Sequence, residues 1–255
     1  FIMANPPFNQ KDWRADNQLI DDERWTGYDT PPTSNANYGW ILNMVSKLSD
    51  NGVAGFILAN GALSADGIEG AIRRKMIEND IVESIVILPR NLFYSTDISV
   101  TLWILNKNKK GRVISRNGEE IHYRDREGDI LFIDMRQMGE PFEKKYVRFT
   151  DEDIQKVART YHNWQRESAS ESYANEPEFC YSASFDKVKA KGFSLVPSKY
   201  IEFVNRDETI DYDIRMKELQ SELADILRKE AESRAAVLEV FKSLGYAIDE
   251  VALPQ

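Results

Sequence analysis

The sequence predicts an α/β fold in which strands and helices alternate along the chain. Residues 53–59 and 81–88 form nearly continuous apolar runs of strand length, as expected of strands buried on both faces of a sheet. Residues 38–48 repeat apolar side chains at helical spacing, and residues 66–79 predict a second helix. This alternation favours a sheet with parallel strands that is covered by helices.

The apolar run 1–4 predicts a first strand, which the tetrad Asn5-Pro6-Pro7-Phe8 ends. Because proline has no N–H group, sheet pairing stops there and the Pro6 carbonyl is left free to accept a hydrogen bond from elsewhere. Asn5 Oδ1 is a second acceptor at the carboxyl end of the strand, where open α/β sheets place their chemistry. With the Phe8 ring beside them, these acceptors can hold an exocyclic NH2 group on a planar ring, as an adenine swung out of a duplex presents it.

The tetrad has a second interpretation, because Asn-Pro and Pro-Pro are also common where a strand passes into a turn. The segment that follows, residues 9–37, is long and polar, yet it contains Trp13, Trp25 and Tyr28. Structureless loops of this length are usually functional or disordered, and the aromatic residues argue against disorder. The context therefore favours a functional site over a simple strand exit.

The middle of the chain predicts further strands at residues 98–105 and 130–133, with a hairpin turn at Asn117-Gly118 between them. Residues 151–167 predict a helix that is capped by Thr150. The basic run 107–112 predicts a solvated turn rather than a phosphate clamp.

The last predicted element is a helix over residues 211–244. Its apolar side chains form one stripe between charged faces, and they are Met216, Leu219, Leu223, Ile226, Leu227, Leu238, Phe241 and Leu244. Such a helix can fold back on its own domain or dock on the helices of a partner, and the stripe alone does not separate these alternatives.

Composition predicts a soluble intracellular protein. The chain has 255 residues, of which 42% are hydrophobic, and no apolar run approaches the length of a membrane span. The single cysteine, Cys180, excludes a disulfide within the chain, and the isolated His122 and His162 suggest no metal site.

The net charge of −9 is unusual for a protein that binds DNA, since phosphate neutralisation dominates duplex binding. The acidic excess is unevenly distributed, with a net charge of −1 over residues 1–112 and −8 over residues 113–255. Any DNA contact is therefore expected in the first part of the chain, and most of the basic surface in a partner.

The tetrad resembles the catalytic motif of amino-group DNA methyltransferases that act on adenine, and the chain as a whole resembles the modification subunit of type I restriction-modification systems. The tetrad is shared by many methyltransferases, whereas the ordered series of segments is more specific. Besides the tetrad, the segments that carry this resemblance are residues 35–40, 52–61, 88–93, 99–105, 193–201 and 244–246.

The resemblance implies a Rossmann-like methyltransferase that transfers a methyl group from S-adenosylmethionine to adenine N6 in double-stranded DNA. It implies that Asn5, Pro6, Pro7 and Phe8 are catalytic. Phe93 or Tyr94, in the loop after the strand at residues 81–88, is a candidate for the second face of the flipped base, and either residue could equally belong to the core. Its partners would be a DNA-specificity subunit, a restriction subunit and a second modification subunit, in the cytoplasm. The DNA recognition sequence would be chosen by another polypeptide.

One departure concerns the methyl donor. In the family, the glycine-rich loop for S-adenosylmethionine precedes the tetrad, which here begins at residue 5, and no such loop is evident elsewhere. We therefore expect residues 1–205 to form the C-terminal half of the catalytic domain, without its cofactor-binding half, and residues 206–255 to form a helical tail for subunit assembly. We also expect this chain by itself to be inactive.

Two alternatives stay open. Methyltransferases that modify glutamine side chains in proteins use a similar Asn-Pro-Pro motif that usually ends in Tyr, so Phe8 and the long C-terminal extension favour DNA. The other alternative is a non-catalytic assembly module that acts through its terminal helix.

Overall fold

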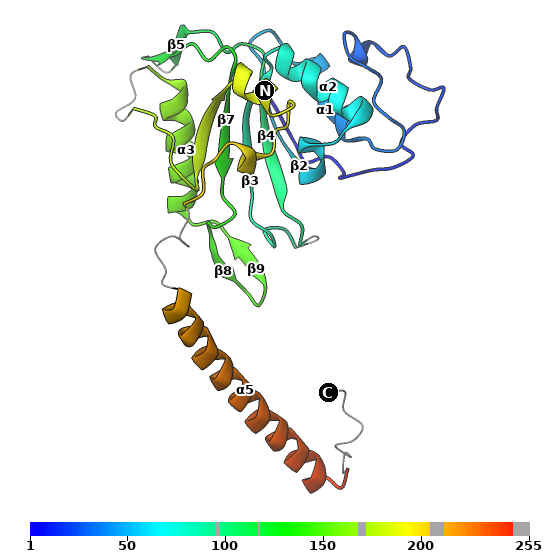
Figure 1. Ribbon diagram of the computed structural model, residues 1–255. Coiled ribbons are helices and arrows are strands. Elements are labelled where there is room, and N and C mark those ends of the chain that lie inside the picture. The colour runs from blue at the N-terminus through cyan, green and yellow to red at the C-terminus, as the bar shows by residue number, and fades with distance from the viewer. Residues whose placement is uncertain (95–96, 117, 168–171, 205–211, 247–255) are drawn as a thin grey trace. The chain divides into compact units, whose positions relative to one another are not determined.

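The computed structural model contains two compact units, Phe1–Phe203 and Val204–Gln255 (Figure 1). The residues that it describes are 1–94, 97–116, 118–167, 172–204 and 212–246.

A six-stranded mixed sheet, in the order β1-β2-β4-β3-β7-β10, forms the centre of the first unit. Strands β1 and β2 are parallel, as are β3 and β7, whereas β4 runs antiparallel between β2 and β3 and β10 runs antiparallel to β7. Four strands therefore end at the same side of the sheet, which we call the carboxyl edge. The strands are β1 (Ile2–Ala4), β2 (Val53–Ala59), β3 (Val82–Ile87), β4 (Val100–Asn106), β7 (Asp129–Asp134) and β10 (Cys180–Ser184).

Both faces of this sheet are covered. Helices α1 (Asn37–Lys47), α2 (Gly67–Glu78) and α4 (Phe185–Ala190) pack on one face, and α3 (Asp151–Gln165) packs on the other. Alternate residues of β3 and β7 enter the two hydrophobic clusters. The first cluster includes Ile41, Phe56, Met76, Ile85, Trp103 and Phe132, and the second includes Val86, Val100, Leu131, Ile133, Trp164 and Cys180.

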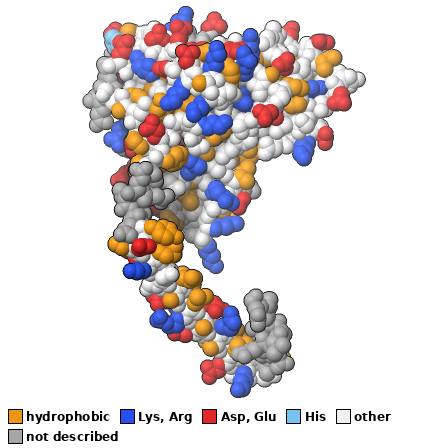
Figure 2. Space-filling model, in the orientation of Figure 1, with side chains coloured by type: hydrophobic (Ala, Val, Ile, Leu, Met, Phe, Trp, Pro, Cys, Tyr) orange, Lys and Arg blue, Asp and Glu red, His pale blue; other side chains and the backbone are white. Residues whose placement is uncertain are grey.

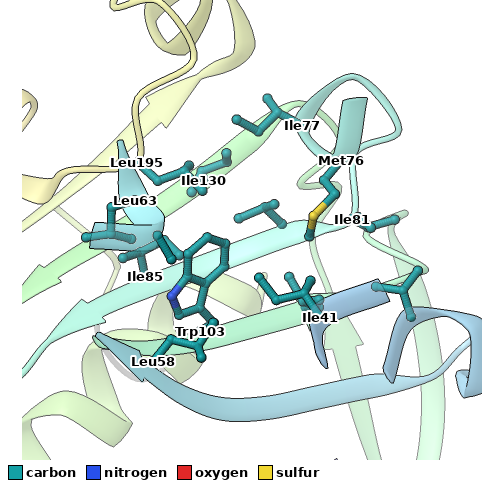
Figure 3. Packing of buried hydrophobic residues seen from close by; sticks show 14 of the residues in the cluster. Ile41, Leu58, Leu63, Met76, Ile77, Ile81, Ile85, Trp103, Ile130 and Leu195 are labelled. Atoms are coloured by element: carbon teal, nitrogen blue, oxygen red, sulfur yellow. The ribbon is translucent and has the colours of Figure 1, made fainter. Parts of the chain in front are cut away.

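The Trp103 indole lies at the centre of the first cluster and is fully buried (Figure 3). It stacks on Phe56 with ring centroids 5.9 Å apart, and it meets the Tyr38 ring edge-on at 6.4 Å. Aromatic pairs of this kind contribute beyond the area that they bury, so this group joins β2, β4 and α1.

The predicted fold class is confirmed, and the predicted strands and helices are present with small shifts at their ends. The Thr150 cap is also confirmed, because Thr150 Oγ1 accepts from the Asp153 N–H at 3.1 Å and Asp153 accepts from the Thr150 N–H at 2.9 Å. The predicted hairpin is formed by β5 (Arg112–Arg116) and β6 (Glu119–Tyr123), although Asn117 lies outside the described residues.

The sequence did not predict the short hairpin of β8 (Glu140–Phe142) and β9 (Tyr146–Arg148), nor β10 and α4. Strands of three residues show too little alternation to be recognised by period. The predicted terminal helix is α5 (Tyr212–Ser243), which has no buried residue. No helix of the described residues is long and apolar enough to cross a membrane.

The prediction of a solvated turn at residues 107–112 is wrong for Lys109, because this residue is only 2% exposed. Its ammonium group pairs with Asp80 and donates to the carbonyls of Val82 and Asp129 at 3.2 and 2.7 Å. Burial lowers the pKa of Lys109, and the Asp80 carboxylate opposes that shift. The lysine thus joins the starts of β3 and β7 and is not available to bind phosphate.

A buried ionic network lies at the opposite side of the sheet from the carboxyl edge. The fully buried Glu83 carboxylate accepts from Arg126 Nε at 3.1 Å and from the Asn106 amide at 2.9 Å. The Tyr161 hydroxyl and the Gln165 amide, both on α3, donate to it at 2.9 and 3.2 Å. Four donors therefore satisfy one buried charge and tie α3 to β3 and β4.

The long segment between β1 and α1 is closed by a reciprocal pair of amides. The Asn9 N–H donates to Asn37 Oδ1 at 3.0 Å, and Asn37 Nδ2 donates to Asn9 Oδ1 at 2.9 Å. Asn9 has a φ of 51°, a left-handed conformation that asparagine tolerates better than most residues. Because Asn9 directly follows the tetrad, this pair anchors the tetrad to the start of α1.

Two tryptophans give the same segment a small core of its own. Trp13 Nε1 donates to the Pro32 carbonyl at 2.7 Å, and the Trp13 and Trp25 rings meet edge-on at 6.2 Å. The Trp13 ring also packs on Gly39 of α1, where an added Cβ would lie 3.1 Å from the indole. The segment is therefore ordered despite its lack of regular secondary structure.

The Glu83 network predicts a large loss of stability when the carboxylate is removed. Glu83→Ala would leave the Arg126 charge buried without its partner, which we expect to lower the free energy of unfolding by about 3–5 kcal/mol in urea denaturation. The matched control is Glu78→Ala, which breaks an exposed ion pair with Arg74 and is expected to cost less than about 1 kcal/mol. Equal losses for the two variants would contradict this account of the network.

The amide pair predicts a local effect. Asn37→Ala would leave the Asn9 N–H without its acceptor, and we expect the free energy of local opening to fall by about 1–3 kcal/mol. Hydrogen exchange at the Asn9 amide measures this change. Asn17→Ala, which alters an exposed residue of the same segment, is the control and should leave the exchange rate unchanged. Unaltered protection in Asn37→Ala would mean that the pair does not hold the segment.

Candidate active site at the carboxyl edge

The tetrad lies directly after β1 at the carboxyl edge, as the sequence predicted. The Asn5 side chain is exposed. Within the described part of the chain, no hydrogen bond reaches Asn5 Oδ1 or the Pro6 carbonyl. Both oxygens are thus free to accept hydrogen bonds from a ligand.

The Phe8 ring is held firmly while part of it stays accessible. It is half-buried and packs against both hydrophobic clusters. A ring fixed in this way offers a flat apolar surface next to the two acceptors.

The two other predicted aromatic residues lie in the loop that follows β3, which also starts from the carboxyl edge. Phe93 is half-buried and packs on the second cluster, which it shares with Phe8. Tyr94 is 68% exposed, and its ring meets the Tyr146 ring of β9 at 4.7 Å. Phe93 is therefore associated with the packing around Phe8, whereas Tyr94 leans on the β8–β9 hairpin.

Asn60 is a further polar residue at this edge that the sequence analysis did not single out. It follows β2, the strand next to β1, and its Oδ1 atom is enclosed without a hydrogen-bond partner among the described residues. The signal was the same as for Asn5, namely an amide that directly follows a buried apolar run.

The carboxylate at the end of β7 is already occupied. Both oxygens of Asp134 accept from Arg136, at 3.0 Å to Nε and 2.6 Å to Nη2. This hydrogen bonding raises the pKa of Arg136. Asp134 is thus a structural partner rather than a free base, and no group of His, Cys, Asp and Glu within the described ranges could hold a metal ion.

An apolar hollow of about 780 Å³ extends from Asn5 along the face of β1, β2 and β4. Its wall includes Met3, Ile57, Leu102 and Ile104, and Tyr161 of α3 borders it. Apolar side chains of the sheet are thus accessible up to the tetrad.

Comparison with known proteins identifies several relatives. Residues 1–209 match the family described as N-6 DNA Methylase. The methylase subunit of the type I restriction enzyme HindI from Haemophilus influenzae is 38% identical over 248 residues, which are 96% of this chain and 52% of that protein. The MjaIX methylase subunit from Methanocaldococcus jannaschii is 34% identical over 250 residues, 96% of this chain and 42% of that protein. The chain thus spans about half the length of these relatives.

Solved structures have the same fold. The methyltransferase subunit of a type I restriction-modification system from Streptococcus thermophilus superposes with a TM-score of 0.65 at 25% identity, over 79% of this chain and 38% of that one. The M protein of the type I restriction enzyme EcoKI superposes with a TM-score of 0.54 at 19% identity, over 93% of this chain and 52% of that one. With most of its length matched by the family and its sheet shared with these structures, the chain belongs to the N-6 DNA methylase family.

Proposed function

We propose that this chain is part of a site-specific DNA methyltransferase that transfers a methyl group to adenine N6 in double-stranded DNA, within a restriction-modification complex. The observation that carries the proposal is the pair of free acceptors, Asn5 Oδ1 and the Pro6 carbonyl, beside the half-buried Phe8 ring at the carboxyl edge. The family membership and the names of the relatives support it.

The chemistry explains why two acceptors are needed. The lone pair of an adenine amino group is delocalised into the ring, so the nitrogen is a poor nucleophile. Acceptors at Asn5 and Pro6 would draw both protons toward a tetrahedral nitrogen and localise the lone pair on one side. Their hydrogen bonds strengthen as positive charge develops on nitrogen, so catalysis follows from orientation and electrostatics without a strong base.

We assign Pro7 to the rigid exit that keeps these acceptors in place, and Phe8 to stacking on the flipped base. Phe93 is our first candidate for the other face of the base, since it packs on the same cluster as Phe8, and Tyr94 is the second.

S-adenosylmethionine is the proposed donor and would supply an electrophilic methyl group. Among the described residues after β2, Gly61 lies within a short 3₁₀ turn (Asn60–Leu63) and Gly67 is the first residue of α2, so no glycine-rich turn leads directly from the strand into a helix. We therefore assign no residue of this chain to hold the donor. We propose that residues 1–205 act together with a cofactor-binding half, as about half the length of the relatives lies beyond the matched part.

Residues 206–255 are proposed to serve assembly. Helix α5 has no buried residue, and Leu219, Leu223 and Ile226 on its apolar stripe are 43, 56 and 62% exposed. A stripe of this length suits docking on partner helices. We propose a DNA-specificity subunit as that partner, in a cytoplasmic complex with a restriction subunit and a second modification subunit, in line with one structural relative from a study of type I complex assembly.

A protein glutamine methyltransferase remains the second candidate, since its substrate amide needs the same two acceptors. The match to the DNA methylase family argues against it. A methyl-transfer assay of the full-length enzyme with its specificity subunit, on duplex DNA and on protein substrates, separates the two activities. Activity of that complex on neither substrate would favour the non-catalytic assembly module.

The tetrad predicts specific losses in the full-length enzyme with its specificity subunit. Asn5→Ala removes one preorganised acceptor and should lower the single-turnover methylation rate by about 10²–10³-fold, whereas DNA affinity should survive. Asn5→Asp retains an acceptor and should keep partial activity. Phe8→Ala should weaken capture of the base by about 1–3 kcal/mol, whereas Phe8→Tyr should be tolerated. A normal rate in Asn5→Ala would contradict the catalytic role and show that the tetrad only ends the strand.

The apolar stripe predicts a separable assembly defect. Replacing Leu219 and Leu223 with Asp should abolish co-purification of the specificity subunit, because each buried leucine contributes about 1.5–3 kcal/mol. The circular dichroism of the isolated chain should still show a folded α/β unit. Ser221→Asp with Ala224→Asp adds the same charge outside the stripe and serves as the control. Collapse of the isolated chain in the leucine variant would show that α5 belongs to the core of its own domain.

A further inference from the structure

We propose that the β8–β9 hairpin is a DNA-backbone contact beside the active site, with Lys144 and Lys145 at its tip binding phosphates of the duplex that carries the target adenine. This inference rests on the proposed function and adds to it the element that holds the DNA. No motif in the sequence pointed to the hairpin.

The hairpin lies on the correct side of the sheet. It follows the carboxyl end of β7, and the loop with Phe93 and Tyr94 follows the carboxyl end of β3, the strand paired in parallel with β7. Figure 1 shows the hairpin projecting from this edge, beyond the ends of the strands. Chemistry at the tetrad and a contact at the hairpin would therefore face the same substrate.

The hairpin contacts the loop that carries Phe93 and Tyr94. The Val147 N–H donates to the Asn91 carbonyl at 3.0 Å, and the Tyr146 and Tyr94 rings are in edge contact at 4.7 Å. At the base of the hairpin, Gly139 has a φ of 93°, and an added Cβ there would lie 2.6 Å from the Val147 side chain. These contacts couple the hairpin to the Tyr94 loop, so DNA seated on the tip would also fix that loop.

The charges of the hairpin leave its tip basic. The Glu140 carboxylate is neutralised by Arg148 at 2.6 Å. Lys144 and Lys145 are exposed and form no ion pair within the described residues, while Glu143 is the one carboxylate beside them at the tip. Lys145 Nζ lies 5.1 Å from the centre of the Tyr146 ring.

The tip of the hairpin, residues 143–145, carries two lysines and one glutamate, a local net charge of +1 in a chain whose net charge is −9. Figure 2 shows Lys and Arg side chains over the part of the first unit where Figure 1 places the hairpin. Two adjacent exposed ammonium groups that form no ion pair among the described residues match the chemistry of a phosphodiester backbone.

A contact of this kind has a function in base flipping. The removal of an adenine from the base stack costs free energy, and protein contacts that hold the flanking phosphates keep the DNA in place during this step. Lysines on a hairpin that contacts the Tyr94 loop can supply this hold without reading the base sequence, which agrees with target choice by a separate subunit.

The test uses the full-length methylase in complex with its specificity subunit, and duplex DNA that contains the target site. Lys144→Gln with Lys145→Gln removes the two charges. The matched control is Lys189→Gln with Lys191→Gln, at two exposed positions. Strand β10 is antiparallel to β7 and its last residue, Ser184, lies opposite Asp129 at the start of β7, so α4 begins at the edge opposite the tetrad. Dissociation constants are measured over a series of salt concentrations, with thermal unfolding as the check on folding.

The expected result is a slope of log Kd against log salt that is smaller by about 1–2 in the hairpin variant, because each lost phosphate contact changes the slope by about 0.9. The control should retain the wild-type slope. An unchanged slope in the hairpin variant overturns the inference. If the variant with an unchanged slope also loses the specificity subunit on purification, the hairpin is a protein interface instead. Methyl transfer to adenine by the wild-type complex is measured in parallel, so failure of the proposed function is detected separately.

Discussion

Burial of the central strands on both faces is the constraint on which the rest of this structure depends. Strands β3 and β7 send alternate side chains into two separate hydrophobic clusters, so neither face can accept an unpaired polar group at low cost. Polar side chains with free hydrogen-bonding capacity are therefore favoured at the ends of the strands, and the buried Trp103 Nε1 of β4 is an exception among the described residues. Asn5 and Asn60 both occupy such positions at the carboxyl edge, after adjacent strands.

The opposite edge shows what the same constraint requires when a charge is buried. Glu83 is fully enclosed, but four donors surround its carboxylate, and Lys109 close by is held by a carboxylate and two carbonyls. One edge thus joins the layers through many internal hydrogen bonds, although the buried Arg126 Nη2 there has no partner among the described residues, whereas the other edge keeps acceptors unfilled. This asymmetry supports the proposed placement of the chemistry at the carboxyl edge without reference to any relative.

Much of this could be predicted from the sequence because the signals are local. Neighbouring residues alone determine the apolar runs of β2 and β3 and the helical period of α1. The tetrad that starts at Asn5 likewise marks the end of its own strand through its prolines. The partners of Lys109 are Asp80 and two distant carbonyls, so its burial has no local signal. The β8–β9 hairpin was missed because its strands are too short for a period and include Pro141. The contact between Tyr94 and Tyr146 joins segments about fifty residues apart, and only the fold brings them together.

Helix α5 has a consequence for the amount of this protein that a cell makes relative to its partner. Its stripe leaves Ile226, Leu227 and Leu244 at 62, 57 and 66% exposure, which is an apolar surface of the kind that drives self-association in water. Under the proposed docking of α5, a copy without its partner would be prone to aggregation and to capture by chaperones or proteases, whereas an assembled copy would have this surface covered. Synthesis in balanced amounts with a partner would then matter as much as the sequence of the helix, because orphan copies would be removed by the cell's own quality control.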